Sequence, residues 1–579
     1  MAAINPNSPA IAAWAARWQA EDYRRAGRIS HRWQAEIARD PYLRDAVMVI
    51  ELVLGGPQTR TIRAATVPVR SVSEDGTVHD ALPLLMDEPE LRQAYSLGSG
   101  TSEGRSLQVS LCMLRVDVMA ILRSGGILAG ICEISLESAS QINDYAQRYV
   151  LLRGDVSGAS FGASRAPSLP GGPQNTDAEI VTFSISDPRD TAGTLIPPFV
   201  IDATRWPNVH ESSNGERYPV IVNRALRCPA RRVTNATTGA NVFVVALRHG
   251  LTIDPTGSAS VFVNGIGVAQ ADATYGWTVQ EPVDDQGTSV TAIRFTNAAT
   301  TWEDTDAVHV TVEQFAELER RYSPVGVVRY IVSEFSPIGV QGLNPELFAT
   351  AEGRWAVGSG WPRCIVNSTT GGGSVLDWIE TGFLASFPMI SMAWEAGGYG
   401  PILTDRRLPP VADWTAGAAP LMGRASAVQE TAKNEIYNEF QIRYGYDPLN
   451  DVYRQTMQRG ALTSGVCQQS RLMVGQRDAP VLESLYVEDD TTAAYVLDWL
   501  VDHLALPSYL VEYEAMPWIA LRYRRGDPVL LTDSDLGWQR EQATIEALTY
   551  RRGRSVVVLR VWLRYLDLGG QGLSRPVTL

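Results

Sequence analysis

The sequence predicts a mainly β protein made of several domains. It has 579 residues, several times the usual domain size of about 100 to 200 residues. Its 49 glycines and 33 prolines, with long runs rich in Val, Thr, Ser and Tyr, favour many short strands joined by tight turns. Hydrophobic residues make up 45% and charged residues 20% of the chain, so each domain can bury a core.

Residues 1–41 form a predicted amino-terminal helical segment. Between residues 8 and 38, Trp14, Trp18, Trp33 and Ile37 recur at helical spacing among Arg and Glu residues, which indicates one or two amphipathic helices. Trp14 and Trp18 have two readings, since aromatic residues on a helix face either pack in an ordinary core or anchor a partner chain.

Residues 42–178 are predicted to form a first β-barrel-like domain. Its expected strands are separated by Gly-rich and Asp-rich turns, and they run Val47 to Leu54, Leu107 to Leu114, Ile127 to Leu136 and Tyr149 to Val156. The stretch 158–177 is rich in Gly, Ser and Pro, so we expect a loop there that closes the domain.

An inserted β sandwich is predicted at residues 236–320, after junction strands at 179–235. The sequence alternates apolar and polar residues in four runs, Val242 to Leu247, Ala259 to Val263, Val290 to Phe295 and Val308 to Val312. Polar turns flank the segment on both sides, so we expect a self-contained peripheral module.

Residues 321–433 are predicted to be a mixed α/β region. Two stretches have helical character, 324–334 and 374–386, and the strand Met389 to Trp394 comes after them.

Residues 434–579 are predicted to form a second β-barrel-like domain with a packed helix. The expected strands are Ile436 to Tyr446, Ser508 to Glu514, Pro528 to Thr532 and Ser555 to Tyr565. A helix at 490–506 is expected to be capped by Asp490 or Thr491 and stopped by Pro507.

The sequence Gly526-Asp527-Pro528 predicts a tight β turn. Gly526 permits a positive φ angle, the carboxylate of Asp527 can accept amides of its own turn, and Pro528 fixes φ at the entry to an edge strand.

The formal net charge of -14 opposes stable binding to nucleic acid, because affinity for a phosphate backbone comes mainly from cations that displace counterions. DNA could still pass along a weakly repulsive wall. The five cysteines are scattered and form no CxxC pair, so no disulfide framework is expected. We find no signal peptide and no apolar run of about 18 residues, which predicts neither secretion nor a membrane span and places synthesis and assembly in a cytoplasm.

No catalytic, cofactor-binding or metal-binding residue is predicted. Ser102 sits in a GxSxG sequence, but a strand comes after it where a nucleophile elbow needs a helix. The six histidines never pair at i, i+4, so no zinc site is indicated. Gly371-Gly372-Gly373-Ser374 has no lysine for a phosphate and reads as a linker. The Glu488-Asp489-Asp490 run fits helix capping better than calcium, and the Asn-x-Thr triplets at Asn235 and Asn367 mean little without secretion.

Two blocks of the sequence carry family motifs. The first contains Pro83-Leu84-Leu85-Met86-Asp87, Leu152-Arg153-Gly154-Asp155 and Tyr218-Pro219-Val220-Ile221-Val222. The second contains NEIYNEFQIRYGY from Asn434 to Tyr446, Ser470 to Gly475, Asp489 to Ala493 and Arg525 to Leu531. In order and spacing they resemble the tail hub, or baseplate hub, proteins of long-tailed bacteriophages and gene transfer agents.

This resemblance implies a non-enzymatic structural protein of the virion tail tip, assembled in the host bacterial cytoplasm. It implies a ring, expected to be a homotrimer, that joins the tail tube to the baseplate, lines the exit channel and docks receptor-binding proteins or fibres. Other implied partners are the distal tail ring, the tape measure protein and a central tip. Residues 236–320 exceed a minimal hub, so a neighbouring ring protein stays open. Two other classes also stay open, a carbohydrate-binding or carbohydrate-active β protein and a cell-surface or fibre adhesin.

Overall fold

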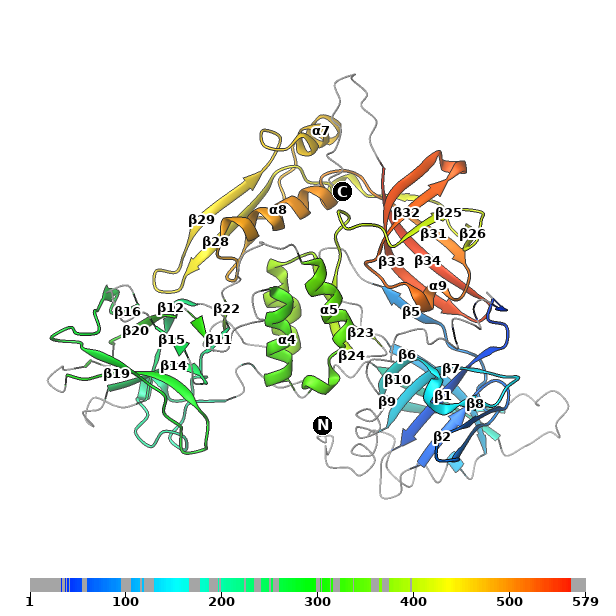
Figure 1. Ribbon diagram of the computed structural model, residues 1–579, viewed down its shortest axis with the longest axis horizontal. Helices are drawn as coiled ribbons and strands as arrows, with labels where there is room; N and C mark the ends of the chain where they lie inside the picture. The colour runs from blue at the N-terminus through cyan, green and yellow to red at the C-terminus, as the bar shows by residue number, and fades with distance from the viewer. Residues whose placement is uncertain are drawn as a thin grey trace.

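The fold is described from a computed structural model. It covers residues 33–563 with gaps, the longer of which are 55–59, 95–105, 119–129, 166–177, 187–195, 234–240, 254–259, 316–322, 356–363 and 367–373. The chain forms several β-rich lobes around two central helices (Figure 1). The prediction of a mainly β, multidomain protein is confirmed.

The first barrel is built on a six-stranded sheet with the order β2-β1-β7-β9-β10-β6. Its strands are β1 (Ala46–Leu54), β2 (Arg60–Ala64), β6 (Ser106–Leu114), β7 (Ile131–Ser138), β9 (Tyr149–Arg165) and β10 (Ala178–Ser186). Strand β1 reads AVMVIELVL and is buried along its whole length, since one face lines the barrel core. The other face lies under a small sheet of β3 (Val69–Val72), β4 (Val78–Ala81) and β8 (Asn143–Asp144).

The two edges of this sheet are bridged by the segment Leu82–Met86. On one side the Ala65 N–H donates to the Leu82 carbonyl at 2.9 Å, next to β2, and on the other the Met86 N–H donates to the Ser110 carbonyl of β6 at 3.0 Å. The loop expected at 158–177 is corrected for residues 158–165, which continue β9 as a strand to Arg165, whereas residues 166–177 lie outside the described residues. The barrel is therefore closed by a segment that precedes β6 in the chain.

The second barrel is built on a sheet with the order β25-β32-β33-β34-β31-β26. Its strands are β25 (Ala412–Thr415), β26 (Leu421–Arg424), β31 (Tyr509–Ala515), β32 (Pro528–Asp533), β33 (Trp538–Arg551) and β34 (Arg554–Trp562). Leu421 makes β bridges to Ala416 and Ala418 in the turn between β25 and β26, which joins the two ends of the sheet. Two short strands add to it, β27 (Gln429–Glu430) on β31 and β5 (Leu91–Ala94) on β33.

The composition of the second barrel corrects one expectation. The strand predicted at Ile436 to Tyr446 is β28 (Phe440–Asp447). It belongs to a separate sheet, in which it lies between β29 (Val452–Arg459) and β30 (Leu482–Glu483). Its alternating Phe440, Ile442 and Tyr444 pack in the central core that also contains residues of helix α8 (Asp490–Leu504), not in the barrel. The barrel instead takes β25 and β26 from the region expected to be mixed α/β. Apolar alternation identifies a buried face, but not the element that buries it.

The two barrels share one circular strand order. When the six strands of each barrel are numbered along the chain, both run 1-4-5-6-3-2 and return to strand 1. In the first barrel the segment Leu82–Met86 joins strands 2 and 3. Strands 2 to 6 also run in matching directions, whereas strand 1 is antiparallel to strand 4 in the first barrel and parallel to it in the second.

The central region holds the largest core cluster and the two helices α4 (Pro324–Phe335) and α5 (Pro345–Arg354). Ser323 and Asn344 cap them by accepting backbone amides, and a proline stands after each cap at the first helical position. The predicted helix at 324–334 is confirmed. The predicted stretch 374–386 is helical as α6 (Val375–Asp377), a π turn (Trp378–Phe383) and a 3-10 turn (Leu384–Ser386), and the hairpin β23 (Ile390–Glu395) and β24 (Gly398–Leu403) comes next.

The inserted module contains two four-stranded sheets, β12-β20-β16-β17 and β13-β14-β19-β18. The strands are β12 (Ala225–Pro229), β13 (Arg231–Arg232), β14 (Asn241–Leu247), β16 (Val261–Val263), β17 (Ile266–Gly267), β18 (Trp277–Gln280), β19 (Val290–Phe295) and β20 (Val308–Val312). Strands β19 and β20 have the predicted bounds. Strands β12 and β13 of these sheets come before residue 236, the predicted start of the module. Two short pairs lie beside it, β15 (Leu251–Thr252) with β21 (Gln314–Phe315) and β11 (Val220–Val222) with β22 (Cys364–Val366).

Strands β28, β29 (Val452–Arg459) and β30 (Leu482–Glu483) pack with helices α7 (Gly465–Val474) and α8 (Asp490–Leu504). The predicted helix at 490–506 is confirmed, and its cap is Asp489, whose carboxylate accepts the Thr492 amide at 2.9 Å. A short helix, α9 (Ile519–Arg522), precedes the Gly526 turn.

The amino-terminal helices predicted at 8–38 lie almost wholly outside the described residues. Of that stretch the structure describes Trp33 and Ile37, both helical. Trp33 is buried in the core of the first barrel, where its indole meets the ring of Tyr149 edge to face at 6.3 Å. Trp14 and Trp18 keep both of their readings.

Candidate functional site

Most sequence motifs with possible chemistry fall outside the described residues. This holds for Ser102, Gly371 to Gly373, Asn235 and Asn367. The acidic run at 488–490 serves helix α8, because Asp489 caps it and Asp490 accepts the phenol of Tyr444 at 2.8 Å. Among the described residues, no three or more His, Cys, Asp or Glu side chains are grouped to hold a metal ion.

His503 is a buried structural histidine. Its Nε2 accepts the Arg406 amide at 3.2 Å and its Nδ1 lies 2.8 Å from the Trp499 carbonyl, so the neutral ring uses Nδ1 as donor and Nε2 as acceptor. Burial lowers the pKa of His503 to about 4, which agrees with a neutral ring. Both nitrogens are occupied, so the ring has no free position for a substrate or metal.

A row of buried charges crosses the first barrel. Arg63, Glu51, Glu133 and Arg153 lie side by side on β2, β1, β7 and β9, because the register pairs Glu51 with Arg63, Glu133 with Glu51, and Arg153 with Glu133. All four side chains are nearly inaccessible to solvent. Arg63 Nε lies 3.1 Å from Glu51, and Arg153 Nε lies 2.9 Å from Glu133.

The pKa values of the two carboxylates in this row are shifted in opposite directions. Burial raises the pKa of Glu133, but the charges of Arg148 and Arg153 outweigh burial and bring it down to about 2. The pKa of Glu51 is raised, by burial first and then by the charge of Glu133, although Arg63 and the phenol of Tyr145 oppose the rise. These groups form ion pairs with one another beneath the small β3-β4-β8 sheet, so the row acts as a structural ion network.

This network was not predicted from the sequence. The charges stand inside apolar strands such as AVMVIELVL and ICEISLES, and a glutamate within such a run is the signal that could have found them.

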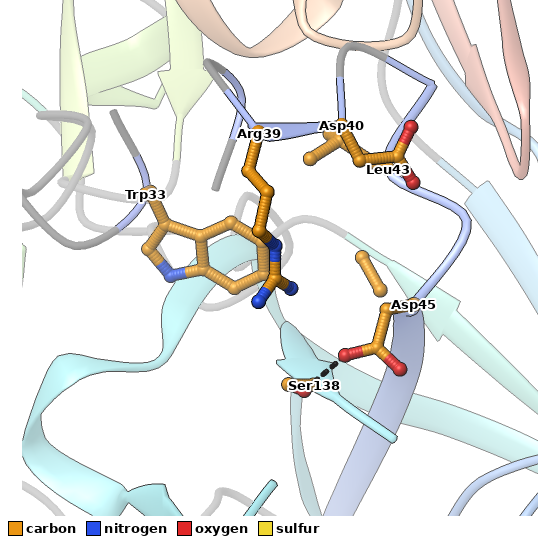
Figure 2. Close-up of a pocket in the computed structure, with 7 residues that line it drawn as sticks. Trp33, Arg39, Asp40, Leu43, Asp45 and Ser138 are labelled. Atoms are coloured by element: carbon orange, nitrogen blue, oxygen red, sulfur yellow. Dashed lines mark hydrogen bonds between the residues drawn. The ribbon is translucent and has the colours of Figure 1, made fainter. Parts of the chain in front are cut away.

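One small pocket lies where the amino-terminal segment meets the first barrel (Figure 2). Trp33, Arg39, Asp40 and Asp45 are among its lining residues, and its volume of about 20 Å³ is room for roughly one water molecule. Asp45 accepts the Ser138 hydroxyl, the bond drawn in Figure 2, so its carboxylate already serves the local structure. The pocket is too small for a sugar or a cofactor.

The two barrels are joined by contacts from several elements. Strand β5 comes from the first barrel's sequence, between β2 and β6, yet it pairs antiparallel with residues 547–550 of β33 in the second barrel. Tyr149 of the first barrel donates to the Leu521 carbonyl at 2.8 Å, and Tyr550 of the second lies in the first barrel's core. Arg551 also pairs with Glu90 at 2.8 Å. One chain therefore fixes two barrels edge to edge.

A second candidate surface is formed by β29 and α7, at the upper left and top of Figure 1. Strand β29 is an edge strand, and five of its eight residues are exposed. Helix α7 buries only Cys467 and Ser470, while Leu472 and Met473 on it are exposed, as is Leu462 in the preceding turn. Exposed apolar side chains beside an open strand edge are typical of a protein interface.

No family model and no curated protein matches the sequence. Among solved structures, the chain is similar to a tail protein from Neisseria meningitidis MC58, with a TM-score of 0.34 and 8% identity over 89% of this chain and 96% of that one. It is also similar to the prophage tail protein gp18 from Listeria monocytogenes EGD-e, with a TM-score of 0.25 and 11% identity over 59% of this chain and 87% of that one. TM-scores this low do not establish a common fold.

Within the described part of the chain, no helix combines the length and the apolar character that crossing a membrane requires.

Proposed function

We propose that this chain is a non-enzymatic structural protein of a phage-type tail tip, acting as the hub or as a neighbouring baseplate ring. The observation that carries the proposal is the pair of barrels with one circular strand order, held edge to edge within a single chain by β5. A repeat of this kind suits a protein whose task is to present similar surfaces at regular angles around an axis.

The proposed assembly is a closed ring of three copies. Three chains with two barrels each present six similar barrels, which matches a tail tube that ends in six equivalent edges. Such a pseudo-six-fold ring would join the tube to the baseplate and line the exit channel. The net charge of -14 suits a wall past which DNA slides without adhering.

The same proposal assigns places to the remaining partners. The tube, or a distal tail ring, and the tape measure protein would meet the barrels, whereas receptor-binding proteins, fibres or a central tip would dock on the periphery. The inserted module lies at the left of Figure 1, on the far side of α4 from the barrels, which suits a peripheral role. The chain would reside in the virion tail tip after assembly in the host cytoplasm.

Imaging of the intact particle tests the proposal. We expect three copies at the end of the tail tube, with six barrels around the channel. A ring of six copies, or barrels that face away from the channel, would contradict it. Purified protein should also show no turnover of peptidoglycan, polysaccharide or ester substrates, and activity abolished by one point substitution would contradict the non-enzymatic part.

A further inference from the structure

The fifth strand of each barrel carries a β-bulge at the same place. In the first barrel, β9 pairs with β10 and its register shifts at Ser157, since Val156 faces Ile185 and Gly158 faces Ser184. In the second barrel, β33 pairs with β34 and its register shifts at Glu546, because Ile545 faces Leu559 and Ala547 faces Val558. A bulge interrupts regular pairing and bends the strand that carries it, so it marks a definite position along each strand.

The other side of each strand matches as well. The Val156 N–H donates to the Gly130 carbonyl at 2.8 Å, just before β7 begins. The Ile545 N–H likewise donates to the Asp527 carbonyl at 3.1 Å, just before β32 begins. In both barrels, pairing with the neighbouring strand, β7 or β32, therefore ends at the residue before the bulge. Val156 of the first barrel thus corresponds to Ile545 of the second.

With this alignment, Gly158–Phe161 of the first barrel is equivalent to Ala547–Tyr550 of the second barrel. In the second barrel, Ala547–Tyr550 pairs with β34 on one side and with β5 on the other. In the first barrel, Gly158–Phe161 pairs with β10 on one side, and within the described residues no strand pairs with its other side. Among the residues that the structure describes, the first barrel thus has an open edge at the position where the second barrel is filled.

We propose that β29 of a second copy of this chain pairs with the open edge Gly158–Phe161. The inference rests on the ring assembly proposed above, and it names the contact that links one copy to the next. The chain's own β5 supplies the precedent, because it makes the corresponding contact on the second barrel. Addition of a strand to an open sheet edge satisfies backbone donors and acceptors of both partners.

Its place in the chain and its exposure identify β29 as the strand that pairs with this edge. Strand β5 is inserted between strands 2 and 3 of the first barrel, and β29 is inserted between strands 2 and 3 of the second, β26 and β31. Figure 1 shows β29 at the upper left and β9 at the lower right, so they do not meet within one chain. A second copy is needed to bring them together.

The backbone of β29 is ready to pair. Arg443 on β28 uses its carbonyl to accept the Ser484 amide at 2.9 Å, on the side away from β29. Because the N–H and C=O of one strand residue point the same way, its partner Thr456 directs both groups to the open edge. The small side chains of Gly158, Ala159 and Ser160 leave room on the receiving strand for a close approach.

Photo-cross-linking tests the contact. A photoreactive amino acid replaces Ser160, which is exposed, in particles assembled from a mixture of ¹⁴N- and ¹⁵N-labelled chains. We expect a mixed-isotope product that joins residue 160 to a peptide containing 452–459. The matched control carries the same group at Gln108, exposed on β6, and should not give this product. Capture of another protein, another segment of this chain, or nothing overturns the proposal.

A pair of substitutions at Thr456 tests the donor strand. Thr456→Pro removes the outward N–H without touching a bond to β28, whereas Thr456→Val keeps that N–H. The cross-link should be lost in Thr456→Pro and kept in Thr456→Val, with both variants unfolding at the same temperature as the parent. Equal cross-linking in both variants overturns the proposal. A three-copy ring seen by imaging without this cross-link would reject the strand contact and leave the proposed function standing.

Discussion

The phenol of Tyr149 donates a hydrogen bond of 2.8 Å to the backbone carbonyl of Leu521, 372 positions further along the chain. Both groups are buried where the two barrels meet. Tyr149→Phe should therefore lower the free energy of unfolding by about 1 to 3 kcal/mol, because it leaves a buried carbonyl without a donor. Urea unfolding measures this loss.

The matched control for that substitution is Tyr446→Phe. Tyr446 donates to Asp451 at 2.7 Å in an exposed bond, so water can replace the phenol and the loss should stay below about 0.5 kcal/mol. Equal losses for the two variants would show that the Tyr149 contact does not stabilise the barrel joint.

Glu133 is expected to be the most sensitive member of the buried row. Glu133→Gln removes the buried carboxylate that pairs with both Arg148 and Arg153, which should cost about 3 to 5 kcal/mol at neutral pH. The ordinary pKa is 4.5 and the folded pKa is about 2. The stabilisation by ionised Glu133 is therefore present above pH 4.5 and is lost as pH falls towards 2. The difference in unfolding free energy between the parent and the Glu133→Gln variant should narrow over that pH range.

Glu51→Gln is the matched comparison on the neighbouring strand. Because the folded pKa of Glu51 is raised, its ionisation costs stability as pH rises above its ordinary value. The glutamine variant removes that cost and should be less destabilised at neutral pH than Glu133→Gln. Denaturant titrations at pH 7 and pH 3 compare the two, and an equal loss at pH 7 would contradict the assignment of opposite electrostatics.

The Gly526 turn should tolerate no side chain. Gly526 has φ of +82°, as the sequence predicted, and a Cβ there would lie 2.7 Å from Ile402 Cγ2 on β24. Gly526→Ala should therefore combine backbone strain with a clash between the second barrel and the central region, a loss of about 2 kcal/mol or more. Gly537→Ala is the control, since Gly537 has φ of +70° with nothing within 4 Å, and it should cost only about 1 kcal/mol. Thermal unfolding ranks the two, and the reverse order would contradict the close approach.

Local signals in the sequence predicted local structure well. The Gly526 turn formed as expected, with the Asp527 carboxylate accepting the Arg524 amide at 2.9 Å, although Pro528 enters a strand that lies between β25 and β33 and is not an edge. Strand β33 was missed because its first ten residues, WQREQATIEA, are rich in residues that favour helices. Its strand state is imposed by pairing with β32 and β34.

Local sequence signals did not predict contacts between residues that are distant in sequence. Nothing in the four residues of β5 indicates that they pair with β33, more than 450 positions later. The buried charges were hidden for the same reason, since Glu51 meets Glu133 and Arg63 only after three strands align. Expected domain boundaries at 42, 236 and 434 stay predictions, because each depends on such pairings.

The inserted module gives the last prediction, a comparison of two deletions. Replacing 236–320 by a short Gly/Ser linker would leave β12 and β13 without their sheets and expose Ala225 and Cys228, which belong to the module's core. Replacing 225–315 removes the complete module, but it also removes Asp284, which accepts the phenol of Tyr218 at 2.8 Å. We expect the longer deletion to be soluble and the shorter one to aggregate, as measured by size-exclusion chromatography. If both aggregate, the module is part of the central core; if the shorter one alone is soluble, its boundary is at 236 after all.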